Sequence, residues 1–320
     1  MCAVTLAQAK LNVQDDLQAG IIDEFAKSSY ILNNIPFADV VSPTGGGATL
    51  TYAYTRQITQ PTAAFRKVNA EYTPQEVTKQ RYTTDLKVFG GAFEVDRIIA
   101  GMGGIVDEVS WQAQQKVKAA SALFTDTIIN GNTSTDEDVF DGLDVALTGG
   151  VTEVNANGTA IDLSTSANVT TNYMAFLDTL DEFLMGLDGT PNALLMNNKM
   201  LAKLRAVARR VGMYQVTKDN FGHQIEMYGN IPMVDVGAKA GSNDPIIATG
   251  SSGGDTSIYA VRFGMDAFHA ISMAGQPPVR IWLPDFTTAG AVKKGEVEMV
   301  AGCALKTTKS CGVLRKIKVQ

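Results

Sequence analysis

The chain has 320 residues, 45% hydrophobic and 19% charged, a composition that indicates a globular protein with a large core and excludes a disordered chain. Its net charge of −6 excludes a broad basic surface for nucleic-acid phosphates. No stretch reaches the roughly 18 apolar residues of a membrane span, so we expect no membrane partner.

The charged fraction is below the usual quarter of a soluble protein, which favours a surface that is partly covered by another chain. The three cysteines, Cys2, Cys303 and Cys311, are widely spread and form no Cys-x-x-Cys pair. They predict neither a zinc site nor a disulfide framework, and a reducing cytoplasm suits them. The N-terminus becomes acidic before any long apolar run, so we expect neither a signal peptide nor an anchor there.

Residues 5–30 are too sparse in apolar side chains to fold alone and are expected to form a short helix and an extended arm. The first strong strand pattern follows in residues 48–61. Apolar and polar side chains alternate there, with Tyr52 and Tyr54 on one face, as in a half-covered strand. Residues 62–81 then have almost nothing with which to build a core. Because a return strand resumes only around Tyr82, Leu86 and Val88, the sequence predicts a long hairpin with a polar far half.

A long helix is predicted after the hairpin. Gly90 and Gly91 interrupt an apolar run and are expected to let the chain turn. In residues 104 to about 130, apolar or small side chains then recur at spacings of three and four, which predicts a helix of roughly seven turns with one buried face. Asp107 is expected in its first turn and Gly131 at its end. A helix of this length is expected to act as a strut.

The remainder of the chain alternates helix and strand and then becomes rich in strands. After a polar loop at 132–147 and an irregular Thr- and Asn-rich region at 148–170, helices are predicted over 172–187 and 198–212. The second helix has Asn197 or Asn198 as its cap and Gly212 as its stop. Strands are predicted over 192–197, 226–237, 257–264, 267–273, 279–283, 297–305 and 312–319, the last five forming a final sheet. This order predicts an α+β fold.

Residues that could carry catalysis are few. The two histidines are His223, in a Gly-flanked loop, and His269, in a strand-like run, and both are assigned structural or surface roles. The chain has no zinc-protease or α/β-hydrolase signature, and its glycine clusters lack the phosphate-loop pattern, so we interpret them as hinges and turns. The sequence therefore predicts no catalytic residues, no cofactor and no enzyme activity.

Two charged clusters have alternative interpretations. An acidic cluster lacks the register of a calcium-binding loop, so a solvated loop is favoured and a weak divalent site at a subunit contact is the alternative; it comprises Asp136, Glu137, Asp138, Asp141 and Asp144. A basic cluster on the helix at 198–212 favours a solvated or inter-subunit face, with contact to enclosed nucleic acid or to a neighbour's carboxylates as the alternative; it comprises Lys199, Lys203, Arg205, Arg209 and Arg210. We predict no metal site.

The order of parts carries a resemblance. In chain order the parts are an arm, a long hairpin followed by "VFGGAFEVD", a long helix with a loop ending in "FDGL", and a mixed domain with "NALLMNNKMLAKLRAV" and "MYGNIPMVDVG". This order resembles that of the tailed-bacteriophage major capsid proteins of the Hong Kong 97 fold. The resemblance covers essentially the whole chain. It implies an N-terminal arm (1–42), an extended loop (43–85), a peripheral domain with a spine helix (86–140), an axial domain (141–299) and C-terminal strands returning to the peripheral domain (300–320).

The same resemblance implies a function. The chain would be a major capsid protein that assembles through pentamers and hexamers, in the bacterial host cytoplasm, into the icosahedral head of a tailed phage. The shell would enclose double-stranded DNA without sequence-specific binding, and because a motor drives the DNA in, the wall can be acidic. Implied partners are further copies of the chain, a portal, a separate scaffolding protein and a possible decoration protein. Crosslinking through Lys67, which lies near the loop tip, is not expected.

In this interpretation the hairpin lacks its own core because a neighbouring subunit covers it. Aromatic residues and arginine dominate interface energetics, so the expected contact residues are those of the hairpin: Tyr52, Tyr54, Arg56, Phe65 and Arg66. Two alternatives stay open. One is an encapsulin-like bacterial nanocompartment shell that packages a cargo enzyme. The other is a soluble α/β enzyme with an undetected site.

Overall fold

The computed structural model describes residues 29–42, 49–102, 107–155, 158–212, 215–218, 224–242, 244–250 and 253–320. Most of the predicted N-terminal arm, together with Cys2 and His223, lies outside these residues. The first half of the chain forms α2 (Tyr30–Asn34), β1 (Phe37–Val41), β2 (Thr51–Gln57), β3 (Lys79–Asp85), β4 (Lys87–Asp96), α3 (Arg97–Gly101) and α4 (Glu108–Asn130). The mixture of helices and sheets confirms the predicted α+β class.

The second half contains the remaining helices and most of the strands. Its helices are α5 (Leu143–Leu147), α6 (Ser166–Met185), α7 (Asn198–Val211) and the 3-10 turn η2 (Thr308–Ser310). Its strands are β5 (Glu153–Val154), β6 (Ile161–Asp162), β7 (Ala193–Met196), β8 (Gln215–Lys218), β9 (Gln224–Tyr228), β10 (Ile231–Asp235), β11 (Asp255–Val261), β12 (Phe268–Met273), β13 (Val279–Trp282), β14 (Val292–Leu305) and β15 (Cys311–Lys318).

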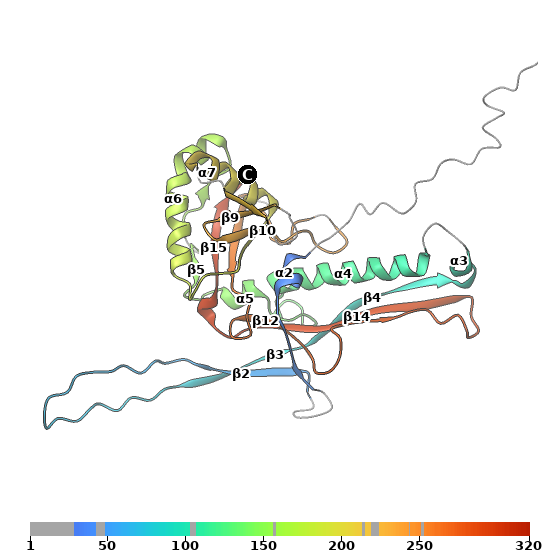
Figure 1. The fold of residues 1–320 in the computed structure, drawn as a ribbon, viewed down its shortest axis with the longest axis horizontal. Helices are drawn as coiled ribbons and strands as arrows, with labels where there is room; N and C mark the ends of the chain where they lie inside the picture. The colour runs from blue at the N-terminus through green and yellow to red at the C-terminus, as the bar shows by residue number, and fades with distance from the viewer. Residues whose placement is uncertain are drawn as a thin grey trace, which may run out of the picture.

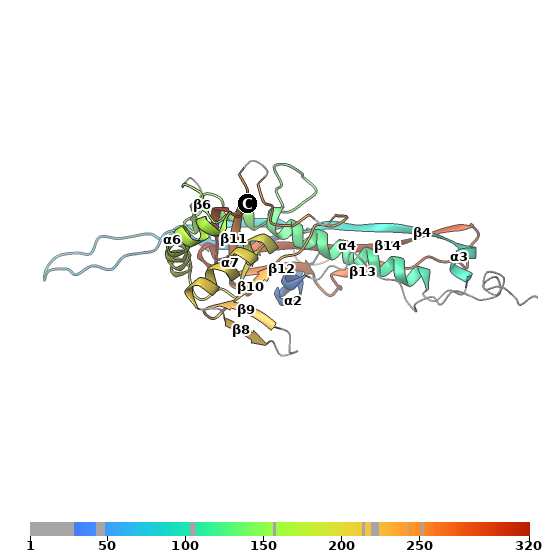
Figure 2. The same ribbon diagram turned by 90° about the horizontal axis from the view of Figure 1, so that it is seen from above.

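One sheet is elongated, and α4 runs alongside it (Figures 1 and 2). Its strand order is β1-β12-β14-β13, and β4 pairs with β14 in antiparallel register from Val292 opposite Asp96 to Ala301 opposite Lys87. The buried face of α4 packs on this sheet through Phe124, whose ring stacks on Phe89 with 5.7 Å between ring centroids. The apolar spacing of three and four in the sequence therefore becomes the face that fixes α4 to the sheet.

A second sheet lies at the other end of the molecule, beside α6 and α7 (Figure 1). Its order is β5-β15-β11-β7-β10-β9-β8, with β6 also paired to β15 and with β7 and β10 parallel. Apolar residues of the two helices and of the central strands form its core, among them Phe176, Leu180, Phe183, Leu194, Leu204, Ile258 and Leu314.

The start of α7 is fixed by one buried amide. Asn197 is the N-cap: its Oδ1 accepts from the Met200 backbone N–H at 2.8 Å, and its Nδ2 donates to the Ile247 carbonyl at 3.0 Å and to Thr256 Oγ1 at 2.9 Å. Gly212 ends the helix in the left-handed conformation, with φ of 75°. Both helix signals in the sequence are confirmed, and the choice between the two candidate caps falls on Asn197.

Two helices begin at residues other than those predicted. Residues 103–106 lie outside the described structure, and Asp107 is the N-cap of α4, accepting from the Ser110 backbone N–H, rather than a residue of the first turn. α6 begins at Ser166 rather than near residue 172, because Thr165 caps it and accepts from the Asn168 backbone N–H. Within this helix the hydroxyl of Thr170 donates to the Ser166 carbonyl four residues earlier, so the polar side chain is satisfied locally.

The expected turn at Gly90 and Gly91 is wrong, because both glycines lie inside β4. A Cβ placed on Gly90 would lie 2.0 Å from the backbone oxygen of Val297 on β14. Glycine is therefore required there for close approach of two strands, and no chain reversal occurs.

The expected final sheet is also wrong, because the closing strands divide between the two sheets. β12, β13 and β14 lie in the sheet beside α4, whereas β11 and β15 pair with each other in the second sheet. Of the strands in residues 300–320, β15 therefore lies in the second sheet and not in the sheet beside α4. Short runs of buried apolar residues look alike in sequence whichever sheet they join.

Among the helices that the structure describes, none combines the length and apolar character needed to cross a bilayer.

Candidate assembly surface

The hairpin predicted from the sequence is present and projects away from the body as a long arm (Figure 1). Its hairpin base consists of β2 and β3, which pair in antiparallel register with Tyr54 opposite Tyr82 and Arg56 opposite Gln80. Residues 58–78, the distal loop, connect the two strands outside any regular strand. The alternating pattern of the sequence thus ends at Gln57, where apolar residues cease to recur on one face.

The hairpin base packs on the body of its own chain. Tyr52 and Tyr54 cover a small apolar cluster on the sheet that contains β12 and β14. The buried members of this cluster are Val41, Leu86, Ile271, Val300 and Ala304. The rings of Tyr54 and Tyr82 stack across the two strands, with 5.8 Å between ring centroids. Cross-strand aromatic pairs of this kind stabilise a hairpin that is too small to fold alone.

Polar contacts tie the hairpin base to the end of β14. Tyr54 Oη donates to the Leu305 carbonyl at 2.9 Å, and burial raises the pKa of this tyrosine. Arg56 donates from Nη2 to the Leu305 carbonyl at 2.7 Å and from Nε to the Lys306 carbonyl at 2.8 Å. Its guanidinium also lies over the Tyr82 ring, 4.3 Å from the centroid. A planar fork that binds two carbonyls and an aromatic face fixes the direction of the arm.

The distal loop lacks such support from the body of the chain. Phe65 is fully exposed, and Val68 is 89% exposed. Local contacts order the loop instead: Arg66 donates to the Ala70 carbonyl at 3.1 Å and lies 5.5 Å from the centroid of the Tyr72 ring. An exposed phenyl ring on a projecting arm is the kind of group that a protein interface buries.

The five residues predicted as inter-subunit contacts therefore fall into two groups. Tyr52, Tyr54 and Arg56 contact their own chain, whereas Phe65 and Arg66 lie on the projecting loop. Sequence reasoning did not identify the partners of the first group, Leu305 and Lys306. No local signal could have done so, since about 250 residues separate them from the hairpin.

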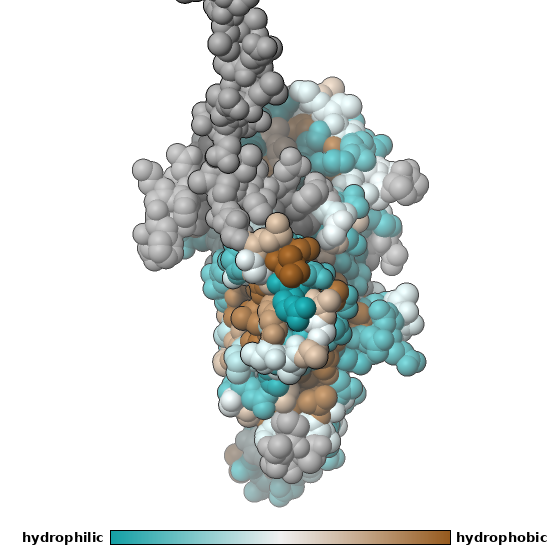
Figure 3. Space-filling model, turned by 90° about the vertical axis from the view of Figure 1, so that its right-hand side faces the viewer, coloured by the Kyte–Doolittle hydropathy of each residue, from teal (hydrophilic) through white to brown (hydrophobic). Residues whose placement is uncertain are grey.

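A second exposed apolar surface lies at the opposite end of the molecule, around α3 (Figure 3). There Ile98, Ile99 and Met102 are exposed by 67%, 50% and 69%, and Val292 on the neighbouring strand by 54%. Asp96 caps α3 and accepts from the Ile98 backbone N–H at 2.7 Å, which fixes this group at the end of β4. The molecule thus exposes apolar side chains at both of its extremities.

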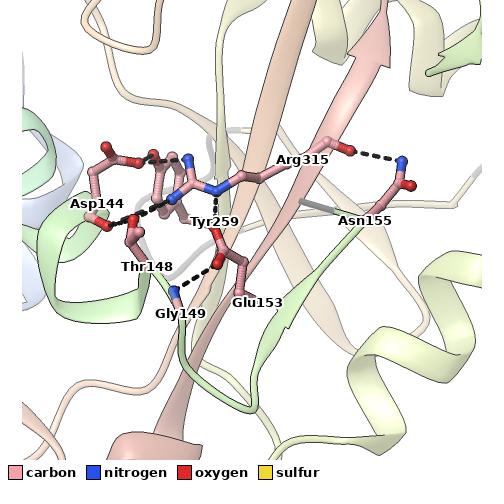
Figure 4. Close-up of polar contacts among 7 residues, drawn as sticks. All are labelled: Asp144, Thr148, Gly149, Glu153, Asn155, Tyr259 and Arg315. Atoms are coloured by element: carbon pink, nitrogen blue, oxygen red, sulfur yellow. Dashed lines mark hydrogen bonds and ion pairs between the residues drawn. The ribbon is translucent and has the colours of Figure 1, made fainter. Parts of the chain in front are cut away.

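A charged network connects α5 with strands of the second sheet (Figure 4). Arg315 on β15 binds Asp144 of α5, with 2.7 Å between Nη1 and Oδ1, and also binds Glu153 of β5 and Thr148 Oγ1. Tyr259 Oη donates to the same Asp144 at 2.8 Å, and burial together with this carboxylate raises the pKa of the phenol. Since α5 packs against α4, the network fixes the second sheet relative to the strut helix.

The acidic cluster forms an exposed loop, as predicted, except at Asp144. Asp141 accepts from the backbone N–H and the hydroxyl of Thr133, both at 2.8 Å, so it closes the loop internally. Within the described residues, no group of three or more His, Cys, Asp or Glu side chains is arranged to hold a metal ion.

The basic cluster on α7 is largely engaged within the chain. Arg205 pairs with Glu226 at 2.7 Å, Arg210 donates to Ser166 Oγ at 2.8 Å, and Lys203 donates to the Ser164 carbonyl. These contacts clamp α7 to the start of α6 and to β9. The solvated or inter-subunit interpretation applies best to Arg209, which is exposed on the same helix.

The reactive groups that the structure describes do not form a catalytic arrangement. Cys303 and Cys311 are buried, and burial raises the pKa of both thiols, that of Cys311 to about 11. His269 is buried in β12, in agreement with a structural role. A pocket of about 280 Å³ lies between α6, α7 and β10, but its walls are mainly apolar, with Asp181 accepting from Tyr228 Oη at 2.7 Å.

No family model matches the chain, and no curated protein matches it in sequence. Its fold is nevertheless shared with solved structures over the whole chain. A chain of the holo-SrpI encapsulin complex from Synechococcus elongatus PCC 7942 is 15% identical, with a TM-score of 0.67 and coverage of 100% of this chain and 98% of that one. The capsid of a native GTA particle gives 13% identity, a TM-score of 0.65 and 99% coverage of both chains.

A chain from Mycobacterium phage Bobi is 12% identical, with a TM-score of 0.63 and coverage of 98% of this chain and 99% of that one. At these identities the likeness concerns the fold. The chain therefore has the Hong Kong 97-type fold, as the resemblance in the sequence implied.

Proposed function

We propose that this chain is the major capsid protein of a tailed double-stranded DNA bacteriophage, a structural protein and not an enzyme. The observation that carries the proposal is the projecting hairpin, whose base is fixed to the body while its distal loop exposes Phe65. The capsid of the GTA particle, which has the same fold over the full chain, supports it.

In this proposal the subunit assembles with itself into pentamers and hexamers of an icosahedral shell. The distal loop is covered by a neighbouring copy, with Phe65 and Arg66 as contact residues, and each copy contributes contacts too small to hold a pair but sufficient in a closed array. The hairpin base sets the direction of the arm through Tyr52, Tyr54 and Arg56. Residues 86–140 and the strands around β14 form the peripheral domain, and the sheet beside α6 and α7 forms the axial domain.

The other partners are proposed on the same basis. Double-stranded DNA is enclosed without sequence-specific binding, which suits a chain with a net charge of −6. A portal and a separate scaffolding protein would act during assembly in the bacterial cytoplasm, and a decoration protein could bind the finished virion. The exposed apolar group around α3 offers a further surface for contacts between copies.

A second candidate function is an encapsulin-like compartment that packages a cargo enzyme. The SrpI encapsulin complex, with the same fold over the whole chain, favours it. Electron microscopy of the purified protein, combined with absorbance at 260 and 280 nm, separates the candidates. Closed shells with nucleic acid support the phage capsid, shells with bound protein and no nucleic acid support the compartment, and a monodisperse monomer in the presence of a scaffold would contradict both.

The contribution of the distal loop is tested by deleting residues 60–75. We expect the shortened chain to stay folded and soluble, because these residues are exposed and the hairpin base keeps its own contacts. It should fail to form closed shells. Normal particles from this deletion would overturn the assignment of the hairpin as the assembly element.

A further inference from the structure

His269 lies directly beneath the hairpin base. It belongs to β12, where successive side chains face opposite sides of the sheet. Phe268 and Ala270 belong to the core beside α4, whereas Ile271 belongs to the cluster covered by the hairpin. His269 shares the face of Ile271 and meets the Tyr52 ring edge to face, with 6.0 Å between ring centroids. The hairpin is thus the cover of this imidazole.

The imidazole is completely buried and polar, yet neither ring nitrogen has a hydrogen-bond partner within the described residues. An unpaired buried polar group costs free energy, and a buried charge without a partner costs considerably more. The site is therefore compatible with a neutral ring and unfavourable for a protonated one.

The charged groups around the site add to this preference. Lys306, which follows β14, places its Nζ 5.6 Å from the centroid of the same Tyr52 ring. Arg56 donates to the Lys306 carbonyl from the hairpin side. The phenols of Tyr52 and Tyr54 also face this junction, and burial raises the pKa of Tyr54 above its ordinary value. A protonated His269 would therefore meet positive charge at the edge of an apolar cluster.

We propose that the hairpin base is an acid-sensitive latch, in which protonation of His269 releases β2 and β3 from the body of the subunit. In the docked state the ring is buried, and lifting the hairpin exposes it to water. In a shell subunit this release would change the direction of the arm that reaches the neighbouring copy, a consequence that rests on the proposed function. The latch itself is a property of the single subunit.

The direction of the pH dependence follows from linkage. In the docked state, burial first and the charge of Lys306 second lower the pKa of His269 from 6.5 to about 4, against a smaller opposing effect of the Ala267 backbone. The solvated ring of the released state has an ordinary pKa near 6.5. The released state therefore binds the proton more tightly. Above about pH 6.5 His269 confers no pH dependence on release; between about pH 6.5 and 4 each unit of acidification favours release by up to about tenfold.

Hydrogen exchange on the isolated subunit tests the proposal, with wild type compared against His269→Leu and His269→Gln from pH 7 to pH 4. Leucine keeps the volume and removes the titration, and glutamine keeps a polar group that does not titrate. Circular dichroism at pH 7 establishes that each variant is folded. After correction for intrinsic exchange rates, peptides of β2 and β3 should lose protection with falling pH in wild type, while peptides of β11 keep theirs.

In both variants the protection of β2 should be independent of pH over this range. The same acid transition in a folded variant, or simultaneous loss of protection in β2 and β11 of wild type, would overturn the latch. A titration of the wild-type imidazoles by NMR gives a measurement that needs no variant. If the His269 signal titrates near pH 6.5 while the hairpin stays protected, the proposal is wrong. None of these measurements requires shells, so the latch can fail while the proposed function stands.

Discussion

Arg56 Nη2 donates to the backbone carbonyl of Leu305 at 2.7 Å, so a residue in the hairpin holds the end of a strand 249 positions further along the chain. The same guanidinium binds the next carbonyl and lies over the Tyr82 ring. Three contacts from one planar group restrict both the position and the tilt of the hairpin base. The arm therefore leaves the body in a direction that the subunit itself determines, before any neighbour contacts it.

We expect Arg56→Lys to loosen the hairpin base although the charge is kept, because lysine cannot bind two carbonyls with the same planar fork. Hydrogen bonds of a charged group contribute about 1.5–3 kcal/mol each at most, so a loss of about 2 kcal/mol in the local stability of β2 is expected. Hydrogen exchange in peptides from residues 51–57 measures it. Arg66→Lys is the matched control, since Arg66 contacts the distal loop alone. Equal protection in wild type and Arg56→Lys would contradict the role given to the fork.

The cap of α7 gives a second prediction. Asn197→Ala removes the N-cap bond to Met200 and leaves the Ile247 carbonyl and the Thr256 hydroxyl with one buried partner fewer. Loss of a cap costs about 1 kcal/mol, and each buried group deprived of a partner costs a further 1–3 kcal/mol. We expect the free energy of unfolding to fall by at least about 3 kcal/mol, the lower end of this sum, in a urea titration.

Asn198→Ala is the control for this change, because Asn198 is exposed at the first position of the same helix. Its substitution should alter the free energy of unfolding by about 0.5 kcal/mol or less. Comparable losses in the two variants would mean that the buried hydrogen bonds of Asn197 contribute no more to stability than an exposed asparagine at the start of α7.

These two sites show what the sequence could and could not predict. The helix at 198–211 was predictable because its cap, its apolar spacing and its terminal glycine all lie within 16 residues. The hairpin was predictable for the same reason, from the alternation around Tyr52 and from the polar stretch after it. Local patterns carry this information wherever one face of an element is buried and the other is not.

The partners of these elements were not predictable. The pattern around Tyr52 and Tyr54 predicts a half-covered strand, for which a neighbouring subunit was the expected cover, yet both residues pack on their own chain, against His269 and the end of β14. β15 and β14 are separated by a short turn but lie in different sheets. Neither pairing leaves a local signal, because a buried apolar strand is equally compatible with several neighbours, and the choice is made by the packing of the whole chain.

The network around Arg315 gives a third prediction. Arg315→Ala would leave Asp144 and Glu153 close together without their cation, at side-chain exposures of 41% and 9%. Removing one member of a partly buried ion pair is destabilising because the remaining charges lose their partner. We expect the free energy of unfolding to fall by about 2–4 kcal/mol, measured by urea titration. Arg209→Ala, at an exposed position on α7, should have an effect within about 0.5 kcal/mol.

A further substitution examines whether the cation or the network as a whole matters. Arg315→Lys keeps one positive charge but cannot contact Asp144, Glu153 and Thr148 together. We expect an intermediate loss of stability. If the lysine variant is as stable as wild type, the contribution of Arg315 is charge neutralisation alone, and the bridging geometry across the two parts of the body is irrelevant to stability.

The last prediction separates folding from assembly at the tip of the arm. Phe65 is fully exposed, so Phe65→Ala should leave the free energy of unfolding of the isolated subunit within about 0.5 kcal/mol of wild type. If a neighbouring copy buries the ring, the same substitution should weaken each inter-subunit contact by about 2 kcal/mol. Because every subunit repeats the contact, the protein concentration needed for shell formation should rise by at least tenfold, as followed by light scattering and electron microscopy.

Val151→Ala is the matched control, because Val151 is 88% exposed and lies outside the hairpin. This variant should assemble as wild type does. Equal assembly of the Phe65 variant and the control would contradict burial of the phenyl ring in a contact between copies. A Phe65 variant that loses subunit stability would instead mean that the ring packs within its own hairpin, and the exposed tip would then no longer support an assembly role.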